Sequence, residues 1–388
     1  MKFLEAYLDN AATTKVKPEV MDVVKIAMTE MYGNPSSLHR KGVEVEKSIK
    51  EARKIVAKAI GGKDQEIYFT SGGTESNNIA IRGMVEATRR RGNHLITTKI
   101  EHPSVLNTFQ YLETKGCKVT YLDVDKRGFI SLQQLEDTIA EDTVLVSIMH
   151  VNNETGSIQP IKEISQLIKR RNKEILFHID AIQSFGKIQF NVEEIQLDGL
   201  SISGHKIHGP KGIGALYIKK GVKVKPIVTG GGHELGIRPG TENVPGIFGL
   251  GEAVKLIFTD QNQYIKNISS LKNHFYSWLD NQLEGVTFNS ENNDSFAPNI
   301  LNVSFSGVKS EVLLHSLEGE GVFVSSGSAC SSKKRGYSHV LTAMGLKDEQ
   351  IDSAIRFSFS DTNTIEQLNY ALEKIEKHVS YIRKIMKR

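Results

Sequence analysis

The chain has 388 residues, of which 39% are hydrophobic and 24% are charged, and its formal net charge is +4. These values are typical of a soluble globular protein of two or three domains, and the small net charge gives no reason to expect a nucleic-acid or membrane-surface partner. No apolar run approaches the roughly 20 residues that cross a bilayer, and no signal peptide is visible. The two cysteines, Cys117 and Cys330, lie far apart in the sequence. We therefore expect a cytoplasmic protein without a disulfide framework.

Apolar runs and amphipathic segments alternate through the first two thirds of the chain. We expect strands at residues 67–69, 94–97, 119–122, 144–149 and 175–179. We expect helices between them at residues 76–91, 104–114 and 161–171. This alternation predicts an α/β fold with a mostly parallel sheet and helices on both faces. Ligands of such sheets bind at the carboxyl ends of the strands, and most of the polar motifs described below follow directly after an apolar run.

The pattern changes beyond Pro245. We expect one long helix over roughly residues 247–283, which carries the chain away from the first sheet. Further strands are expected at residues 299–305, 322–324 and 353–359, and further helices at residues 309–317 and 364–386. These elements predict a second, smaller α/β unit.

Lys206 lies in the run from Ser203 to Gly212, where small residues and imidazole rings flank it after an apolar stretch. A protein that holds an aldehyde cofactor as a Schiff base needs a lysine in such a pocket, because a lysine becomes nucleophilic only when its ammonium form is destabilised. The alternative is a turn with a solvated lysine.

Two further segments carry groups that suit pyridoxal phosphate. Gly73 and Thr74 stand where a strand passes through a glycine turn into a helix, and the free N–H groups of a first helical turn attract phosphate. Asp180 ends a buried strand and can hold a pyridinium nitrogen protonated, while Gln183 can contact the phenolic oxygen of the ring. The alternatives are that Thr74 and Asp180 are only helix caps.

Three more residues are candidates on the same strand ends. His102 can stack on a flat ring and move a proton near neutral pH, or be one of the chain's ordinary structural histidines. Asn153 can contact the ring oxygen or a substrate carboxylate, or belong to a turn. Arg356 interrupts an apolar strand, so it needs an anion, which is either an amino-acid carboxylate or an acidic side chain of the protein.

Cys330 lies among small polar residues, from Val324 to Ser332, and we expect it to be accessible. Cys117 leads into a strand and is expected to be structural.

Together these residues resemble a pyridoxal-phosphate enzyme of fold type I, and more narrowly a cysteine desulfurase of the NifS/IscS type. The resemblance runs nearly from end to end of the chain, through the segments at residues 7–14, 33–37, 148–154, 203–206, 325–330 and 355–358. The segment that contains Cys330 is the most discriminating, because it is similar to the long-loop class of desulfurase and unlike the SufS-type class.

The resemblance implies a role for each candidate. Lys206 would bind the cofactor covalently, Asp180 would pair with the pyridinium nitrogen, and His102 would stack on the ring and move the substrate's thiol proton. Arg356 and Asn153 would bind the substrate carboxylate. The remaining cofactor contacts would come from Gly73, Thr74, Ser203 and His205 at the phosphate, from Gln183 and Asn153 near the ring oxygen, and from Thr241 at the phosphate of the other subunit of a homodimer. No metal is expected.

The function implied is the removal of sulfur from L-cysteine, which gives L-alanine and a persulfide on Cys330. The persulfide would pass to an acceptor such as an iron–sulfur scaffold or a tRNA-thiolation enzyme, without direct nucleic-acid or membrane binding. We expect a large cofactor-binding domain at residues 15–255 and a small domain at residues 1–14 and 256–388, with the cysteine loop at about 325–337. The alternatives are a selenocysteine lyase or an aminotransferase on the same fold, and a non-catalytic sulfur-carrier subunit.

Overall fold

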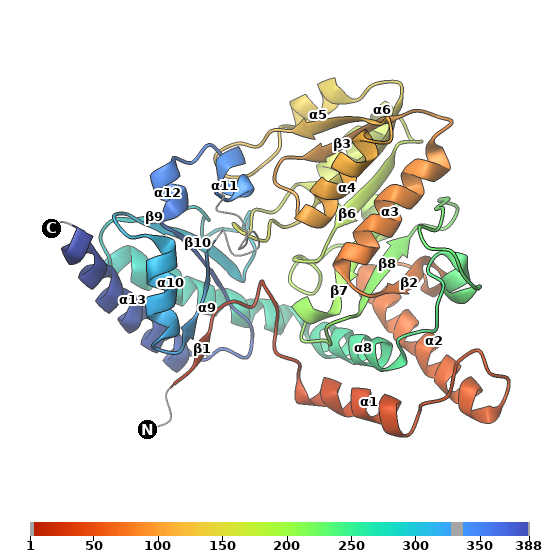
Figure 1. The fold of residues 1–388 in the computed structure, drawn as a ribbon, viewed down its shortest axis with the longest axis horizontal. Helices are drawn as coiled ribbons and strands as arrows, with labels where there is room; N and C mark the ends of the chain where they lie inside the picture. Colours follow the sequence, from red (N-terminus) through yellow and green to blue (C-terminus); the bar gives the residue numbers. More distant parts are fainter. Residues whose placement is uncertain (1–3, 327–336, 387–388) are drawn as a thin grey trace.

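A computed structural model describes residues 4–326 and 337–386 of the chain (Figure 1). Within this part, the larger sheet has seven strands. Their bounds are β2 Ile67–Thr70, β3 His94–Thr98, β4 Lys118–Leu122, β5 Thr143–Met149, β6 Leu176–Asp180, β7 Gly199–Ser203 and β8 Gly214–Ile218. The spatial order is β2-β8-β7-β6-β5-β3-β4, in which only β8 runs antiparallel to its neighbours. The predicted mostly parallel sheet is therefore confirmed.

Helices cover both faces of this sheet, as predicted. The helices of this part are α1 Pro18–Thr29, α2 Arg40–Ile60, α3 Gly73–Thr88, α4 Pro103–Glu113, α5 Leu132–Thr138, α6 Ile161–Arg171, α7 Val192–Ile195 and α8 Val244–Thr259. Neighbouring residues of β3 show the two layers. Leu95 belongs to the buried cluster that includes residues of α3 and α4, whereas Ile96 belongs to the cluster that includes residues of α2, α6 and α8. Side chains of a strand alternate between faces, so a strand buried on both sides is apolar throughout.

A second sheet lies to one side of the first (Figure 1). It consists of β9 Val286–Phe288, β10 Ile300–Phe305, β12 Ser325–Ser326 and β13 Ala354–Ser358, in the antiparallel order β12-β13-β10-β9. The first described strand, β1 Ala6–Tyr7, pairs in parallel with β11 Val322–Phe323, so the N-terminal segment joins this part of the fold. The helices here are α9 Gln261–Gln282, α10 Ser310–Glu318, α11 His339–Ala343, α12 Asp348–Asp352 and α13 Ile365–Met386.

The single long helix expected at residues 247–283 is wrong. Two helices, α8 and α9, occupy this region and are interrupted at Asp260, whose backbone is not helical (φ −144°, ψ 66°). The Asp260 carboxylate accepts a hydrogen bond from the backbone N–H of Gln263 at 3.1 Å. Asp260 is therefore the N-cap of a new helix, which lets the chain change direction between the two sheets.

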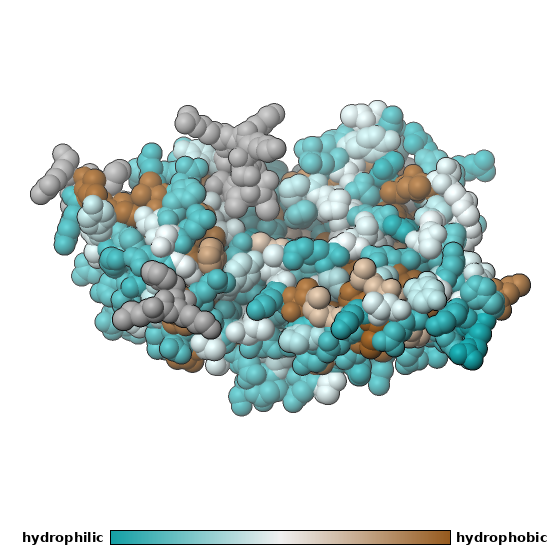
Figure 2. All heavy atoms as spheres, turned by 60° about the horizontal axis from the view of Figure 1, so that its bottom comes forward, coloured by the Kyte–Doolittle hydropathy of each residue, from teal (hydrophilic) through white to brown (hydrophobic). Residues whose placement is uncertain are grey.

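Hydrophilic residues cover most of the face shown in Figure 2, and apolar residues form separate smaller areas on it. Among the helices of residues 4–326 and 337–386, none is both long enough and apolar enough to cross a membrane.

Candidate active site

The side chain of Lys206 is partly buried beside the N-terminal segment. Strand β7 ends at Ser203, and the single 3-10 turn η2 (Gly204–Lys206) places the lysine just beyond the carboxyl end of the strand. Its Nζ donates to the carbonyl oxygens of Ala11 at 2.6 Å and Ala12 at 2.7 Å. The amine is thus directed into the fold rather than toward a solvated face.

Asp180 is the last residue of β6 and is only 4% exposed. Its carboxylate accepts hydrogen bonds from the backbone N–H of Ile182 at 3.0 Å and from Asn77 Nδ2 at 2.8 Å. Burial raises the pKa of Asp180, and the nearby His102 and Lys206 oppose that rise. The alternative role as a helix cap is wrong, because a turn follows Asp180. A buried carboxylate of this kind is stabilised by a cation such as a protonated ring nitrogen.

A chain of hydrogen bonds connects Asp180 to His102. Asn77 donates from the same amide group to Asp180 and to Ser104 Oγ at 2.9 Å, and Ser104 Oγ lies 2.8 Å from His102 Nδ1. His102 also accepts the N–H of Ser104 and so begins α4, with Pro103 in the first turn. Burial lowers the pKa of His102, which leaves the imidazole neutral near pH 7. The ring therefore has a fixed orientation and an available nitrogen.

The first turn of α3 approaches the end of β7 closely. Gly72 has φ 149°, which favours glycine, and it caps the helix, so the alternative in which Thr74 is the N-cap is wrong. A Cβ on Gly73 would overlap the side chain of Ile182, so only glycine leaves space here. Thr74 is exposed in the first turn, and Ser203 is buried next to it across Gly73. The helix start and these hydroxyl groups form a cradle that suits a phosphate.

His205 belongs to the same cradle. Its Nδ1 lies 3.2 Å from Thr13 Oγ1. Burial, and then the charges of Lys206, Lys211 and Lys187, lower the pKa of His205 to about 4. The imidazole is therefore a neutral hydrogen-bonding group at physiological pH.

Arg356 lies on β13 and is 6% exposed. Its Nη2 forms an ion pair with Asp9 at 2.7 Å, and its Nη1 donates to the Asn153 carbonyl oxygen at 2.9 Å. Asp9 is thus the acidic side chain that the sequence offered as one alternative partner. The other alternative, a substrate carboxylate, retains support because the third guanidinium nitrogen, Nε, is buried without a partner in the described structure. Asn152 holds the turn that contains Asn153, because its Oδ1 accepts hydrogen bonds from the N–H groups of Glu154 and Thr155.

Gln183 connects this group of residues to the N-terminal segment. Its Nε2 donates to the Ala11 carbonyl oxygen at 2.9 Å, the same oxygen that accepts from Lys206. Gln183 Oε1 and Asn77 Oδ1 are both buried without a partner among the described residues. Buried polar atoms are normally hydrogen-bonded, so these two oxygens indicate space for a polar ligand. Together with the lysine, the carboxylate and the phosphate cradle, they fit pyridoxal phosphate.

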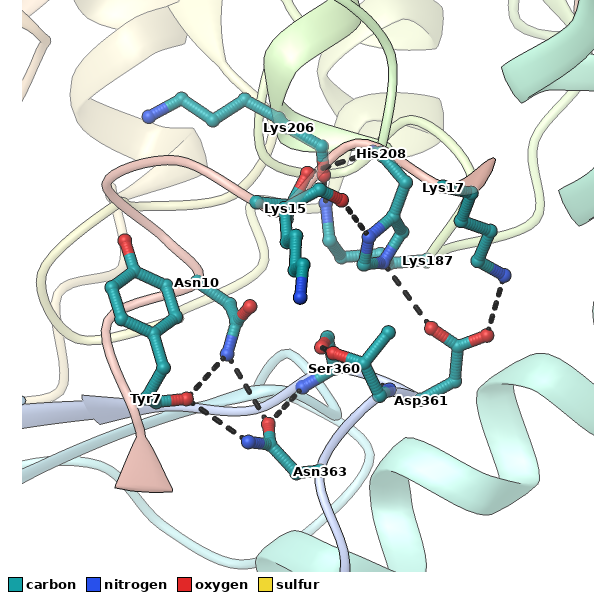
Figure 3. A network of polar contacts seen from close by, with 12 residues as sticks. Tyr7, Asn10, Lys15, Lys17, Lys187, Lys206, His208, Ser360, Asp361 and Asn363 are labelled. Carbon is teal, nitrogen blue, oxygen red and sulfur yellow. Dashed lines mark hydrogen bonds and ion pairs between the residues drawn. The ribbon is translucent and has the colours of Figure 1, made fainter. Parts of the chain in front are cut away.

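Behind Lys206, a second polar network joins its turn to the segment after β13 (Figure 3). His208 has φ 63°, an uncommon conformation for a residue other than glycine. Its ring lies 2.9 Å from the Lys15 carbonyl oxygen and 3.2 Å from Asp361 Oδ1, and Lys17 pairs with the other carboxylate oxygen at 2.7 Å. These contacts hold the turn that carries the lysine in a single conformation.

One predicted site residue, Thr241, is not in contact with this group in the described structure, and another, Cys330, is not described. Thr241 is exposed, in a loop between η3 (His233–Gly236) and α8. Cys330 and most of the predicted cysteine loop lie outside the described residues. Cys117 is partly buried against the cluster under α3 and α4, and burial raises the pKa of its thiol.

The sequence did not point to several residues that the structure adds to the site. Asn77 connects Asp180 to Ser104, and Asp9 pairs with Arg356. Glu101, next to His102, is fully buried and accepts hydrogen bonds from Thr98 Oγ1 at 2.8 Å and the N–H of Met149 at 2.9 Å. The only sign of these residues in the sequence was a polar side chain within an apolar or helical run. In the described part of the chain, no three histidine, cysteine or acidic side chains are grouped so that they could hold a metal ion.

Comparison with known proteins gives full-length similarities. The family model described as aminotransferase class-V matches residues 6–370. The cysteine desulfurase IscS of Dictyoglomus turgidum is 45% identical over 381 residues, which cover 98% of this chain and 96% of that protein. A solved structure titled NifS-like protein has a TM-score of 0.91 and 41% identity and covers 97% of this chain and 100% of its own. Another, titled SspA in complex with cysteine, has a TM-score of 0.81 and 36% identity over 92% of this chain and 100% of its own.

Proposed function

Because the chain belongs to the class-V aminotransferase family, whose members depend on pyridoxal phosphate, we propose that it is a cysteine desulfurase. The observation that carries the proposal is the partly buried Lys206 and the buried Asp180 near the start of α3, in a chain 45% identical over 98% of its length to a cysteine desulfurase.

The proposed reaction converts L-cysteine to L-alanine. The carbon–sulfur bond of the substrate breaks, its β-carbon gains a hydrogen, and the released sulfur forms a sulfur–sulfur bond with Cys330 Sγ. The β-carbon is reduced by the two electrons that the sulfur pair loses, so no external oxidant or reductant is needed. The thiolate form of Cys330 is the nucleophile in this step.

The residues of the site divide this chemistry among them. Pyridoxal phosphate, when bound, supplies a ring that withdraws electrons from the substrate α-carbon. Lys206 would hold the cofactor and would move the proton from the substrate α-carbon, while Asp180 would keep the ring nitrogen protonated. His102 is the residue proposed to move the thiol proton of the substrate, with Nδ1 held by Ser104 and Nε2 left for the substrate.

The phosphate and the substrate carboxylate have their own binding groups. The first turn of α3, with Gly73 and Thr74, binds the phosphate together with Ser203 and His205. Arg356 binds the substrate carboxylate through its Nε side, which the Asp9 ion pair leaves available. Asn153 and Gln183 would contact the substrate carboxylate and the ring oxygen. The hydrogen bond from Arg356 to the Asn153 carbonyl oxygen and the buried Gln183 Oε1, which has no partner among the described residues, support these roles.

The test is to incubate the purified protein with L-cysteine and to measure alanine and protein-bound persulfide. Cys330→Ser should retain bound cofactor but lose both products, whereas Cys117→Ser, in the partly buried position before β4, should leave both unchanged. Near-normal alanine from cysteine in Cys330→Ser would contradict the proposed sulfur transfer. Amino-group transfer to a keto acid without persulfide would instead indicate an aminotransferase, and activity limited to selenocysteine would indicate a lyase.

The proposal extends to the setting of the enzyme. The protein would be a homodimer in which Thr241 reaches the phosphate of the other subunit, and the exposure of Thr241 supports this arrangement. The exposed side chains of Met21 and Met28 on α1 are further candidates for a contact between subunits. The division into domains at residues 15–255 and at 1–14 with 256–388 is consistent with the two sheets. Persulfide sulfur would pass to an iron–sulfur scaffold or a tRNA-thiolation enzyme in the cytoplasm.

A further inference from the structure

Lys187 is a buried lysine that the proposed reaction does not use. It is 3% exposed and lies in the turn that follows β6, seven residues after Asp180 in the sequence. Its Nζ donates to the backbone carbonyl oxygen of Lys206 at 3.0 Å (Figure 3). Two lysines of the same site are thus joined directly, the side chain of one to the backbone of the other.

The charged group that acts on the Lys187 ammonium is a cation rather than an anion. Burial is the main cause that lowers the pKa of Lys187, to about 7, and the charge of Lys206 lowers it further. Among the described residues, no aspartate or glutamate forms an ion pair with Lys187 to oppose these effects. The nearby His205 is neutral at physiological pH, since its own pKa is lowered to about 4. The positive charge around the turn therefore belongs to the lysines, and the buried Asp180 carboxylate acts on Lys206 in the opposite sense.

Coulombic repulsion between two groups acts equally on both of them. A proton on Lys187 therefore makes the protonated form of Lys206 less stable, in the same way that Lys206 does to Lys187. An adjacent cation is one of the known means by which a protein keeps a reactive lysine uncharged near neutral pH. Lys187 is suited to this purpose because its hydrogen bond fixes its distance from the Lys206 backbone.

We propose that Lys187 is a positioning residue for Lys206: it fixes the turn that carries Lys206 and places a buried amine against the Lys206 backbone, and the charge of this amine favours the uncharged form of the Lys206 amine when it acts as a base. This inference rests on the proposed function, in which Lys206 takes a proton from the substrate. While the Lys206 nitrogen is uncharged, Lys187 can hold a proton. When Lys206 takes the substrate proton, the repulsion returns and favours release of that proton to the product.

The test compares three substitutions of Lys187 with a matched control. Lys187→Met removes the charge and the hydrogen bond, Lys187→Gln keeps a donor without the charge, and Lys187→Arg keeps the charge. The control is Lys272→Met, because Lys272 on α9 is also buried, at 2% exposed, donates to the Ala297 carbonyl oxygen at 2.8 Å, and has a pKa lowered by burial to about 8. The pKa of Lys272 is lowered by burial and not by the charge of another lysine.

The first measurement is the pH titration of the visible absorbance of the cofactor bound to the full-length protein, which reports the proton on the nitrogen attached to Lys206. The second uses the full chain after removal of the cofactor, and follows the pH dependence of acetylation of Lys206 by mass spectrometry. In both measurements Lys187→Met and Lys187→Gln should move the midpoint to higher pH by about one unit, which is a tenfold change in the uncharged fraction. Lys187→Arg and Lys272→Met should leave both midpoints at the wild-type pH.

Midpoints unchanged in both Lys187→Met and Lys187→Gln would overturn the inference. A change in Lys187→Met that is absent from Lys187→Gln would also overturn it, because the hydrogen bond alone would then be responsible. If Lys187→Met does not fold, the comparison of the Gln and Arg variants still decides. A wild-type protein that binds no pyridoxal phosphate would refute the proposed function instead, while the acetylation measurement would still test the coupling of the two lysines.

Discussion

Replacing Glu101 with Gln should remove a pH-dependent loss of stability from the cofactor-free protein. Glu101 is fully buried next to His102, and its Oε2 has no partner among the described residues. Burial raises its pKa from 4.5 to about 8, against the opposing effect of hydrogen bonds from Met149 and Thr98. Gln has the same shape, and its oxygen can accept both of these hydrogen bonds.

The sign of the effect follows from the protons that each state binds. Between pH 4.5 and about 8 the folded protein keeps a proton on Glu101 that the unfolded chain has lost. The free energy of unfolding of the wild type therefore falls as the pH rises, by about 1.4 kcal/mol for each pH unit. Between about pH 5.5 and about pH 8 this amounts to roughly 3 kcal/mol, which Glu101→Gln should not lose.

The assay is urea unfolding of both proteins at a fixed protein concentration, at about pH 5.5 and about pH 8. From the lower to the higher pH, the free energy of unfolding of the wild type should fall by roughly 3 kcal/mol more than that of Glu101→Gln. An equal pH dependence of the two proteins would show that Glu101 is ionised in the folded state, and would refute the reasoning.

Two further predictions concern the pairing of distant residues. Arg356→Met should lower the free energy of unfolding by about 3 kcal/mol, because it leaves Asp9 without its buried partner. Adding Asp9→Asn should restore the stability, measured by calorimetry, but not the binding of cysteine, measured by titration. If the double variant recovers both, Arg356 has only a structural role. Mixing inactive Lys206→Ala and Thr241→Ala subunits should restore part of the activity in verified heterodimers, since one of the two pockets is then intact; no recovery would contradict a shared site.

The sequence predicted five of the seven strands of the larger sheet, β2 to β6, to within one or two residues, because strands buried on both faces are short and continuously apolar. It did not predict β7 and β8. It also located Asp180 and Lys206 at strand ends, since a polar residue directly after such a run marks the edge of the sheet. The break at Asp260 was missed because apolar residues continue at helical spacing on both sides of it. A single capping residue is a weaker signal than the periodicity that surrounds it.

The contacts within the site were less accessible to prediction. Asp9 and Arg356 are 347 residues apart, and nothing in the neighbourhood of either residue specifies the other. Asn77 lies within the regular pattern of α3, and only the approach of α3 to β6 makes its amide a ligand of Asp180. Lys187 has an ordinary local sequence, and its proximity to Lys206 depends on how two successive turns pack. Local patterns define elements, whereas the contacts between elements require the fold.

The segment from Asp9 to Lys17 has a consequence for how the enzyme is made. Its carbonyl groups hold Lys206, its first residue holds Arg356, and Lys17 binds Asp361, so the beginning of the chain is in contact with its last strand. A ribosome releases the beginning of a chain long before the end, and contacts between such distant parts form late. The segment from Asp9 to Lys17 must therefore wait for β13 and the loop after it, and substrate binding is complete only once Arg356 and Asp361 have been made.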